Sequence, residues 1–226
     1  MFRKYLTVSL CLLLVAGCEQ RRDTKSVAAA QDDAEYVIAV LVDLSGSFFD
    51  KMTEGGQAHD FMVQLLDKYF RDRIGTNDQI ILAQISGTPD RSLLWQGTPM
   101  ELRKEFPNSR AFCDFLRSKA DPRGSEVHNA LAQTVEQVMS QPNVLNRKAK
   151  SAVFAMTDMF DTGRQSLVTR RRAVKVLSEY GKLGGVVHLY FVDQTLIPVW
   201  QRELATTGLE FSVVSEIRRP KLPSFE

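Results

Sequence analysis

The sequence predicts a single α/β domain built on a mostly parallel, six-stranded sheet with helices on both faces and one short edge strand. Two patterns support this fold class. Several short runs of β-branched and apolar residues are nearly continuous, as in strands buried on both faces. Segments with apolar residues at helical spacing separate these runs, and strands that alternate with helices predict parallel pairing. The 226 residues, 44% of them apolar, are enough for one full-sized core.

The first half of the domain opens on its central strand, YVIAVLVD at 36–43, and a Gly-containing loop follows it. Apolar residues then recur at every fourth position and predict a helix over about 54–72. The run DQIILAQIS at 78–86 predicts a second buried strand. RSLLWQ at 91–96 lies between two prolines, which favours a short edge strand. Two shorter helical pieces, separated by Pro107, come next.

The second half repeats the same alternation. An apolar face of valines and leucines predicts a helix from near Ser125 to just before Pro142. The remaining elements are a strand at 151–158, a basic helix at about 165–182, a strand at 185–193, a helix at about 198–206 and a strand at 210–217. The last residues, 219–226, contain two prolines and no helical period, so we expect coil there.

The amino terminus has the pattern of an export signal. Basic residues at the start precede an apolar stretch, Leu6–Val15, that is too short to span a membrane. Val15-Ala16-Gly17-Cys18 resembles the bacterial lipobox, in which the Cys is acylated and becomes the mature amino terminus. We therefore expect a signal peptide at 1–17, lipidated Cys18 with a polar, flexible tether at 18–34, the folded domain at 35–218 and the Pro-rich tail at 219–226.

Charge and cysteine content exclude some classes of function. Loss of Arg3 and Lys4 with the signal leaves the basic and acidic residues equal in number, so nothing favours binding to nucleic acid. Once Cys11 is removed and Cys18 is acylated, Cys113 is the one thiol left, and no intramolecular disulfide is possible. Cys113 lies among apolar residues of a predicted helix, which indicates a buried, inert thiol.

Three oxygen-bearing side chains follow the central strand. Asp43, Ser45 and Ser47 stand at the carboxyl end of a predicted parallel strand, where ligands bind in sheets of this kind. Alternation in an extended segment would point all three the same way, and Gly46 permits a tight turn between the serines. Carboxylate and hydroxyl oxygens suit Mg²⁺ or Mn²⁺ better than zinc.

This motif resembles the D-x-S-x-S sequence of von Willebrand factor type A (VWA) domains, which have a Rossmann-like fold and a metal-ion-dependent adhesion site. In the resemblance, two later loops complete the site. Ser125, in Gly124-Ser125-Glu126, corresponds to the hydroxyl of the second loop, where Thr is commoner. Asp158, which ends the apolar run FAMTD, corresponds to the carboxylate of the third. The resemblance covers about residues 36–217. It implies a metal site formed by Asp43, Ser45, Ser47, Ser125 and Asp158.

The chain departs from the family pattern in several places. Met159 and Phe160 stand where a Gly often follows the third-loop Asp, which predicts a stiffer loop and an apolar ring beside the metal. The last helix that is usual in the family is missing here, so the sequence does not show what covers one face of the sheet. Asp50 has the spacing at which integrin β subunits begin a second metal site, but Lys51 follows it instead of an acid, so we interpret Asp50 as a surface acid.

The three histidines show no ligand spacing among themselves. His188 alternates within a strand and is interpreted as a core residue with its hydrogen bonds satisfied. His128 lies one turn beyond Ser125, within reach of the site, but a place on the helix surface is the favoured interpretation.

The resemblance implies a binding protein and not an enzyme. One coordination position of the metal would face solvent, where an Asp or Glu carboxylate of a partner protein is the natural ligand. We therefore expect cation-dependent protein binding, for adhesion or complex assembly, by a lipoprotein of the bacterial envelope. It would face the periplasm or the cell surface. Glu19 after the lipidated Cys is not the Asp associated with inner-membrane retention, which favours the outer membrane.

Two other functions remain open from sequence. A Mg²⁺-dependent phosphotransferase or phosphohydrolase of the haloacid-dehalogenase type also places an Asp after its first parallel strand. Such enzymes need a general acid two residues later, where this chain has Ser45, which does not donate a proton near neutral pH. The third possibility is a scaffold whose metal only stabilises the fold.

Overall fold

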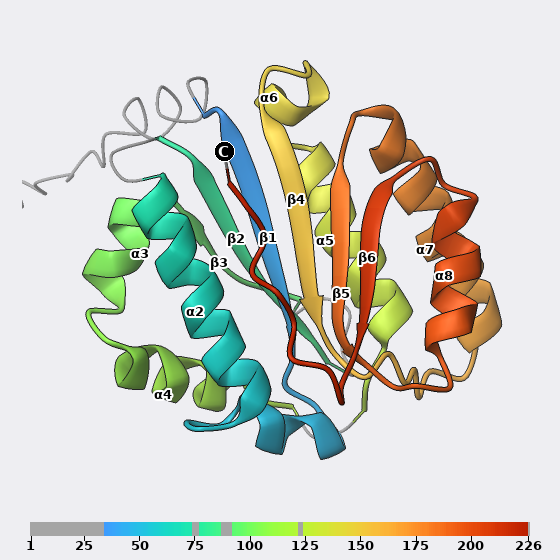
Figure 1. The fold of residues 1–226 in the computed structure, drawn as a ribbon, viewed down its shortest axis with the longest axis horizontal. Helices are drawn as coiled ribbons and strands as arrows, with labels where there is room; N and C mark the ends of the chain where they lie inside the picture. Colours follow the sequence, from blue (N-terminus) through green and yellow to red (C-terminus); the bar gives the residue numbers. More distant parts are fainter. Residues whose placement is uncertain (1–33, 74–76, 87–91, 122–123, 226) are drawn as a thin grey trace, which may run out of the picture.

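The computed structural model describes residues 34–73, 77–86, 92–121 and 124–225. The expected signal peptide, Cys18 and nearly all of the tether lie outside these residues. The described part is one α/β domain in which a six-stranded sheet is covered by helices on both faces (Figure 1). None of the helices within it is both long enough and apolar enough to cross a membrane.

The sheet has the order β3-β2-β1-β4-β5-β6, so β1 is central, as expected. All neighbouring strands pair in parallel except β2 and β3, which are antiparallel and place the short β3 at an edge. The predicted fold class is therefore confirmed. The strands are β1 (Tyr36–Asp43), β2 (Gln79–Ile85), β3 (Leu93–Gly97), β4 (Lys150–Met156), β5 (Val186–Val192) and β6 (Glu210–Ser215).

The helices also follow the predicted order, with two additions. A 3₁₀ helix replaces the expected loop after β1, and a one-turn helix, α6, follows α5. The helices are η1 (Gly46–Met52), α2 (Gln57–Asp72), α3 (Pro99–Glu105), α4 (Ser109–Lys119), α5 (Val127–Met139), α6 (Pro142–Leu145), α7 (Ser166–Lys182) and α8 (Ile197–Ala205). The helix expected from residue 54 begins three residues later because Gly55, with φ of 80°, and Gly56 precede it.

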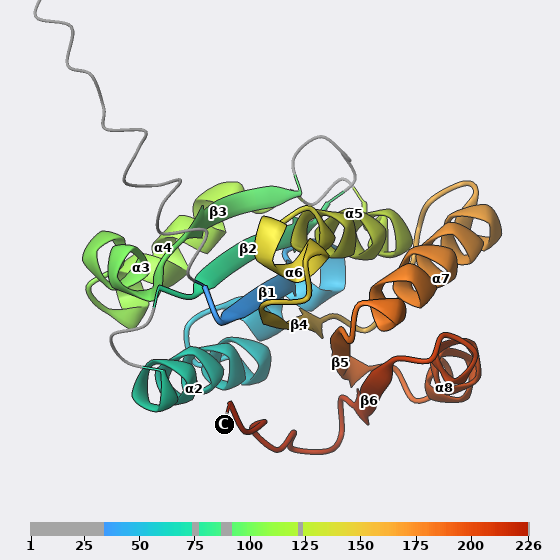
Figure 2. The same ribbon diagram turned by 90° about the horizontal axis from the view of Figure 1, so that it is seen from above.

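Two cores flank the sheet, and side chains of β1 alternate between them. Val37 and Leu41 point into the core shared with α5, α7 and α8. Ile38 and Val42 point into the core shared with α2, α3 and α4. This alternation in a strand with no polar residue before Asp43 explains why β1 is buried on both faces (Figure 2).

The carboxyl-terminal tail covers part of the sheet beside α2, where the last helix was expected to be missing. The described residues of the tail, 219–225, form no helix or strand, as predicted, but they run back along the sheet toward the start of β1 (Figure 1). Phe225 is 1% exposed, and its ring lies 4.9 Å from that of Tyr69 and 6.0 Å from that of Phe154 between centroids. A buried aromatic anchor thus attaches the tail to the second core.

Candidate metal centre

The predicted site residues lie at the carboxyl edge of the sheet. Asp43 ends β1, and β4, its parallel neighbour, ends one residue before Thr157. Because Val42 pairs with Met156, Asp43 and Thr157 leave the sheet side by side. The Oγ1 hydroxyl of Thr157 donates a 2.8 Å hydrogen bond to Asp43 Oδ2. The sheet register therefore brings the first and third predicted loops together.

Asp43 is buried, with 1% of its surface exposed. Its Oδ1 accepts hydrogen bonds from the Ser45 amide at 3.0 Å and the Ser45 hydroxyl at 2.5 Å. Burial raises the pKa of Asp43 to about 6, although the bonds from Ser45 and Thr157 favour the charged form. The nearby charge of Asp158 also raises this pKa. Burial therefore makes the charged form of Asp43 costly, and a nearby positive charge would stabilise that form near neutral pH.

The D-x-S-x-S motif bends more sharply than an extended segment. Ser45 has extended backbone angles and precedes η1, while Gly46 has a φ of 41°, a conformation that favours glycine. The expected turn at Gly46 is confirmed. The expected alternation is wrong beyond Ser45, because Gly46 and Ser47 already belong to the 3₁₀ helix. The side chain of Ser47 lies outside the described part of the structure.

Ser125 is held at the same edge by backbone hydrogen bonds. Its amide donates to Thr162 Oγ1 at 2.9 Å, and the Thr162 amide donates to the Ser125 carbonyl at 2.8 Å. The Glu126 amide donates to the Ser86 carbonyl at 3.3 Å, just past the end of β2. Ile85 of β2 pairs with Asp43, so these bonds connect the second loop to the end of β1.

The hydroxyl of Ser125 is an unsatisfied polar atom. Its Oγ is buried and has no hydrogen-bond partner among the residues that the structure describes. A buried polar atom without a partner costs free energy, so such an atom calls for an explanation by an ion, a water or a ligand. Ser125 also lines a polar cavity of about 410 Å³ between the start of α5 and the loop before α7.

Asp158 is half-buried and follows β4. Its Oδ1 accepts a 2.9 Å hydrogen bond from the Phe160 amide. Burial raises the pKa of Asp158, and Glu216 and Asp193 raise it further, while Lys51 opposes them. Met159 has a φ of 68°, a conformation that favours glycine, which matches the Gly of the family pattern at this place. Its side chain is buried in the core, whereas Phe160 is 50% exposed.

The donor set fits a hard divalent cation. Asp43 and Asp158 supply carboxylates, and Ser45 and Ser125 supply hydroxyls, which together are the oxygen ligands that Mg²⁺ and Mn²⁺ prefer. The buried, unpaired Oγ of Ser125 and the desolvated carboxylate of Asp43 are the two observations that favour an ion here. Across the described ranges, no three His, Cys, Asp or Glu side chains gather as a metal cluster.

His128 corrects one sequence interpretation, because it is buried and not on the helix surface. Its Nδ1 lies 3.0 Å from the Ser166 carbonyl and 3.1 Å from Asp161 Oδ2, so Nδ1 carries a proton that it donates. Burial lowers the pKa of His128, and Asp161 opposes this. The His128 ring packs at a tilt of 50° against the ring of Trp200, with centroids 5.6 Å apart. His128 thus fixes the loop that carries Asp158 against α5.

The other interpretations of single residues agree with the structure. His188 Nδ1 bonds to Ser212 Oγ at 2.8 Å, as expected for a satisfied strand histidine. Cys113 is a buried free thiol, and Asp50 is exposed.

Comparisons with known proteins find similarity in fold. No protein-family model matches the sequence, and no curated protein matches it. Several solved structures are similar. The N-terminal domain of TFIIH p34 has 9% identity over 82% of this chain and 94% of that one, with a TM-score of 0.53. The pilus adhesin SpaC of Lactobacillus rhamnosus GG, in an open conformation, has 13% identity and a TM-score of 0.53 over 79% of this chain.

The chain spans 28% of the length of SpaC. Manganese-loaded TRAP of Plasmodium vivax has 15% identity over 81% of this chain and 70% of that one, with a TM-score of 0.49. At these identities the likenesses to p34 and SpaC show the fold alone. They agree with the VWA-like architecture expected from the sequence.

Sequence reasoning missed four residues of this edge. Thr157 bonds to Asp43, while Asp193, Glu216 and Lys51 act on the charge of Asp158. Asp193 and Glu216 each follow an apolar strand, the same signal that identified Asp43 and Asp158, so they were recognisable in principle. Lys51 carries no such signal because it reaches the edge from η1.

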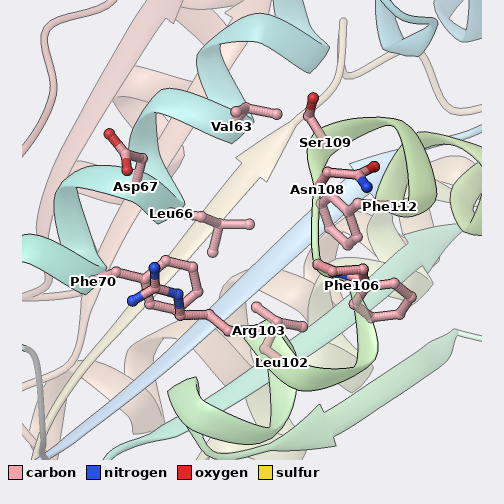
Figure 3. Close-up of a pocket in the computed structure, with 11 residues that line it drawn as sticks. Val63, Leu66, Asp67, Phe70, Leu102, Arg103, Phe106, Asn108, Ser109 and Phe112 are labelled. Carbon is pink, nitrogen blue, oxygen red and sulfur yellow. The ribbon is translucent and has the colours of Figure 1, made fainter.

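A second hollow, of about 230 Å³, lies between α2, α3 and α4 (Figure 3). Leu66 and Phe70 of α2 face Leu102 and Phe106 across it, and the Arg103 guanidinium lies 5.6 Å from the centre of the Phe70 ring. None of the predicted metal ligands lines this hollow. It is therefore separate from the candidate metal centre.

Proposed function

We propose that this chain is a membrane-anchored protein that binds another protein through a divalent cation held at the carboxyl edge of its sheet. One observation carries the proposal. The fold brings Asp43, Ser45, Ser125 and Asp158 from three separate loops to one edge, and it leaves the Ser125 hydroxyl buried without a partner among the described residues.

Some residues of the proposed centre supply negative charge, and others orient the carboxylate or supply a neutral oxygen. When bound, Mg²⁺ or Mn²⁺ supplies an electrophilic centre for a carboxylate of the partner protein. Asp43 supplies the buried negative charge, and Ser45 and Thr157 orient its carboxylate. Ser125 contributes a neutral oxygen, and Asp158, which is half-buried, lies on the solvent side. Two carboxylates among neutral hydroxyls leave the cation able to attract an acidic side chain.

The anchor and the candidate site would lie at opposite ends of the sheet. Lipidation of Cys18 would attach the chain to the membrane ahead of the domain, and β1 enters the sheet at its amino edge. Asp43 leaves at the carboxyl edge, which faces away from that end (Figure 1). The candidate centre would therefore lie at the end of the domain away from the tether, and Glu19 favours anchoring in the outer membrane.

The anchor is testable by one substitution. Cys18→Ser removes the acylated thiol, and the described domain has no helix that could cross a membrane. We expect the Cys18→Ser protein to move from the membrane fraction to the soluble fraction after export. Retention of this protein in membranes after a high-salt wash would contradict lipid anchoring.

Metal-dependent capture separates protein binding from its alternatives. Immobilised protein should retain an envelope partner in millimolar Mg²⁺ and release it in EDTA while circular dichroism stays unchanged. If the chain hydrolyses a generic phosphate ester and the Asp43→Asn variant does not, the chain is instead a phosphohydrolase. Loss of folding in EDTA would indicate a structural metal. The enzyme is the weaker alternative, because Ser45 occupies the general-acid position and its hydroxyl bonds to Asp43.

A further inference from the structure

Acidic residues end four neighbouring strands at the candidate metal centre. Asp43 ends β1, while Asp158, Asp193 and Glu216 follow β4, β5 and β6, and these four strands are adjacent in that order. The Asp193 amide donates to the Asp158 carbonyl at 3.1 Å, and the Glu216 amide donates to the Val192 carbonyl at 3.1 Å. These backbone bonds fix the acids of β4, β5 and β6 beside one another.

The two outer acids already have partners within the chain. Asp193 Oδ1 accepts from the Thr195 amide at 2.8 Å and from the Thr195 hydroxyl at 2.6 Å. Glu216 Oε2 accepts a charged hydrogen bond from Lys51 Nζ. Asp43 and Asp158 also accept hydrogen bonds, from Ser45 and Thr157 and from the Phe160 amide, and they are the two carboxylates of the proposed centre.

Lys51 is placed to act on all three acids beyond β1. Its side chain is 32% exposed, and its Nζ lies 5.2 Å from the centre of the buried Phe48 ring. The ring and the bond to Glu216 hold the ammonium at the edge. Its charge favours the ionised forms of both acids: it opposes the rise in the pKa of Asp158 that burial causes, and it adds to the lowering of the pKa of Asp193 that the bonds from Thr195 cause. Lys51 is thus a fixed positive charge beside the candidate ligand Asp158.

We propose that Lys51 sets the cation affinity of the candidate centre, because its ammonium on Glu216 weakens the attraction of the strand-end acids for a divalent ion. This inference rests on the proposed function. The same positive charge lowers the excess of negative charge that an acidic partner meets at the edge. Lys51 therefore acts as a specificity-determining residue for an anionic ligand and does not coordinate the metal.

The test uses two substitutions that break the same ion pair with opposite changes in charge. In the mature, lipidated chain in detergent at low ionic strength, Lys51→Gln should raise the affinity for Mn²⁺ about fivefold. Glu216→Gln should lower it by about the same factor, because it removes an acid and leaves the ammonium uncompensated. Isothermal titration calorimetry measures both affinities, and circular dichroism shows that the fold is kept. A purely structural role of the ion pair predicts changes in the same direction.

Lys182→Gln is the matched control, since Lys182 also forms an ion pair with a glutamate, Glu179 at 2.8 Å, at the end of α7. Its Mn²⁺ affinity should equal that of the unmodified chain. Equal affinities for the Lys51→Gln, Glu216→Gln and unmodified chains would overturn the role of Lys51 and leave the metal centre standing. Absence of Mn²⁺ binding from the unmodified chain and from both variants would overturn the proposed function as well.

Discussion

Asp43→Asn is expected to reduce the affinity for Mn²⁺ and Mg²⁺ by about a hundredfold or more. Loss of groups that only orient a ligand already costs ten- to a hundredfold in metal affinity, and Asp43 is proposed as a ligand itself. The substitution keeps the shape of the side chain, so its Oδ1 can still accept from Ser45. Calorimetric titration with Mn²⁺ measures the loss.

Asp193→Asn is the control for this experiment, because Asp193 is a partly exposed acid at the end of β5, two strands from β1 in the sheet. It should change the affinity only severalfold, through its charge. A Mn²⁺ affinity that survives Asp43→Asn unchanged would exclude the proposed centre, although the fold would stand.

The same substitution should stabilise the metal-free domain at neutral pH. Burial raises the pKa of Asp43 from 3.8 to about 6, so the folded state holds this proton more tightly than the unfolded state. Stability without metal should therefore fall as pH rises from about 4 to 6, by about 2 kcal/mol, and stay lower above that range. Asp43→Asn should remove this fall. Urea unfolding in EDTA at pH 4 and pH 7 gives both free energies.

The order and type of the main elements could be predicted because the hydrophobic pattern encodes them locally. β1 is apolar on both faces, and the spacing of Phe61, Leu65 and Tyr69 matches the buried stripe of α2. The 3₁₀ helix after β1 escaped prediction because its Gly-Ser start is typical of any loop. Its helical form depends on buried packing of Phe48 and Met52 in the core, which no local pattern shows.

The site was predictable to the extent that it lies at strand ends. Asp43 and Asp158 follow apolar runs, and parallel strands carry such residues to one edge. Lys51 could not be found in this way, since its contact with Glu216 joins residues 165 positions apart in sequence. The burial of His128 likewise depends on Asp161 and Trp200, which approach from other loops and helices. Contacts of this kind follow from the assembled sheet and not from any single segment.

The carboxyl-terminal tail covers part of the second core as coil. Its prolines prevent a regular helix, so the cover depends on individual side chains and not on an apolar stripe. Phe225 packs edge-on against Tyr36, Tyr69 and Phe154, with ring planes at 82°, 82° and 71°. Leu222 is half-buried against the same core. A short coil can therefore protect the face of β1 and β4 when one aromatic ring fills the gap beside α2.

Phe225→Ala is accordingly expected to lower the free energy of unfolding by about 3 to 5 kcal/mol, the usual cost of removing a fully buried phenylalanine. Phe160→Ala is the control, since Phe160 is 50% exposed and its loss should change stability by about 0.5 kcal/mol or less. Urea unfolding followed by circular dichroism compares the two. If both variants unfold like the unmodified chain, Phe225 does not contribute to the core in solution. A large loss confined to Phe225→Ala would establish the tail as a structural part of the domain that covers the second core.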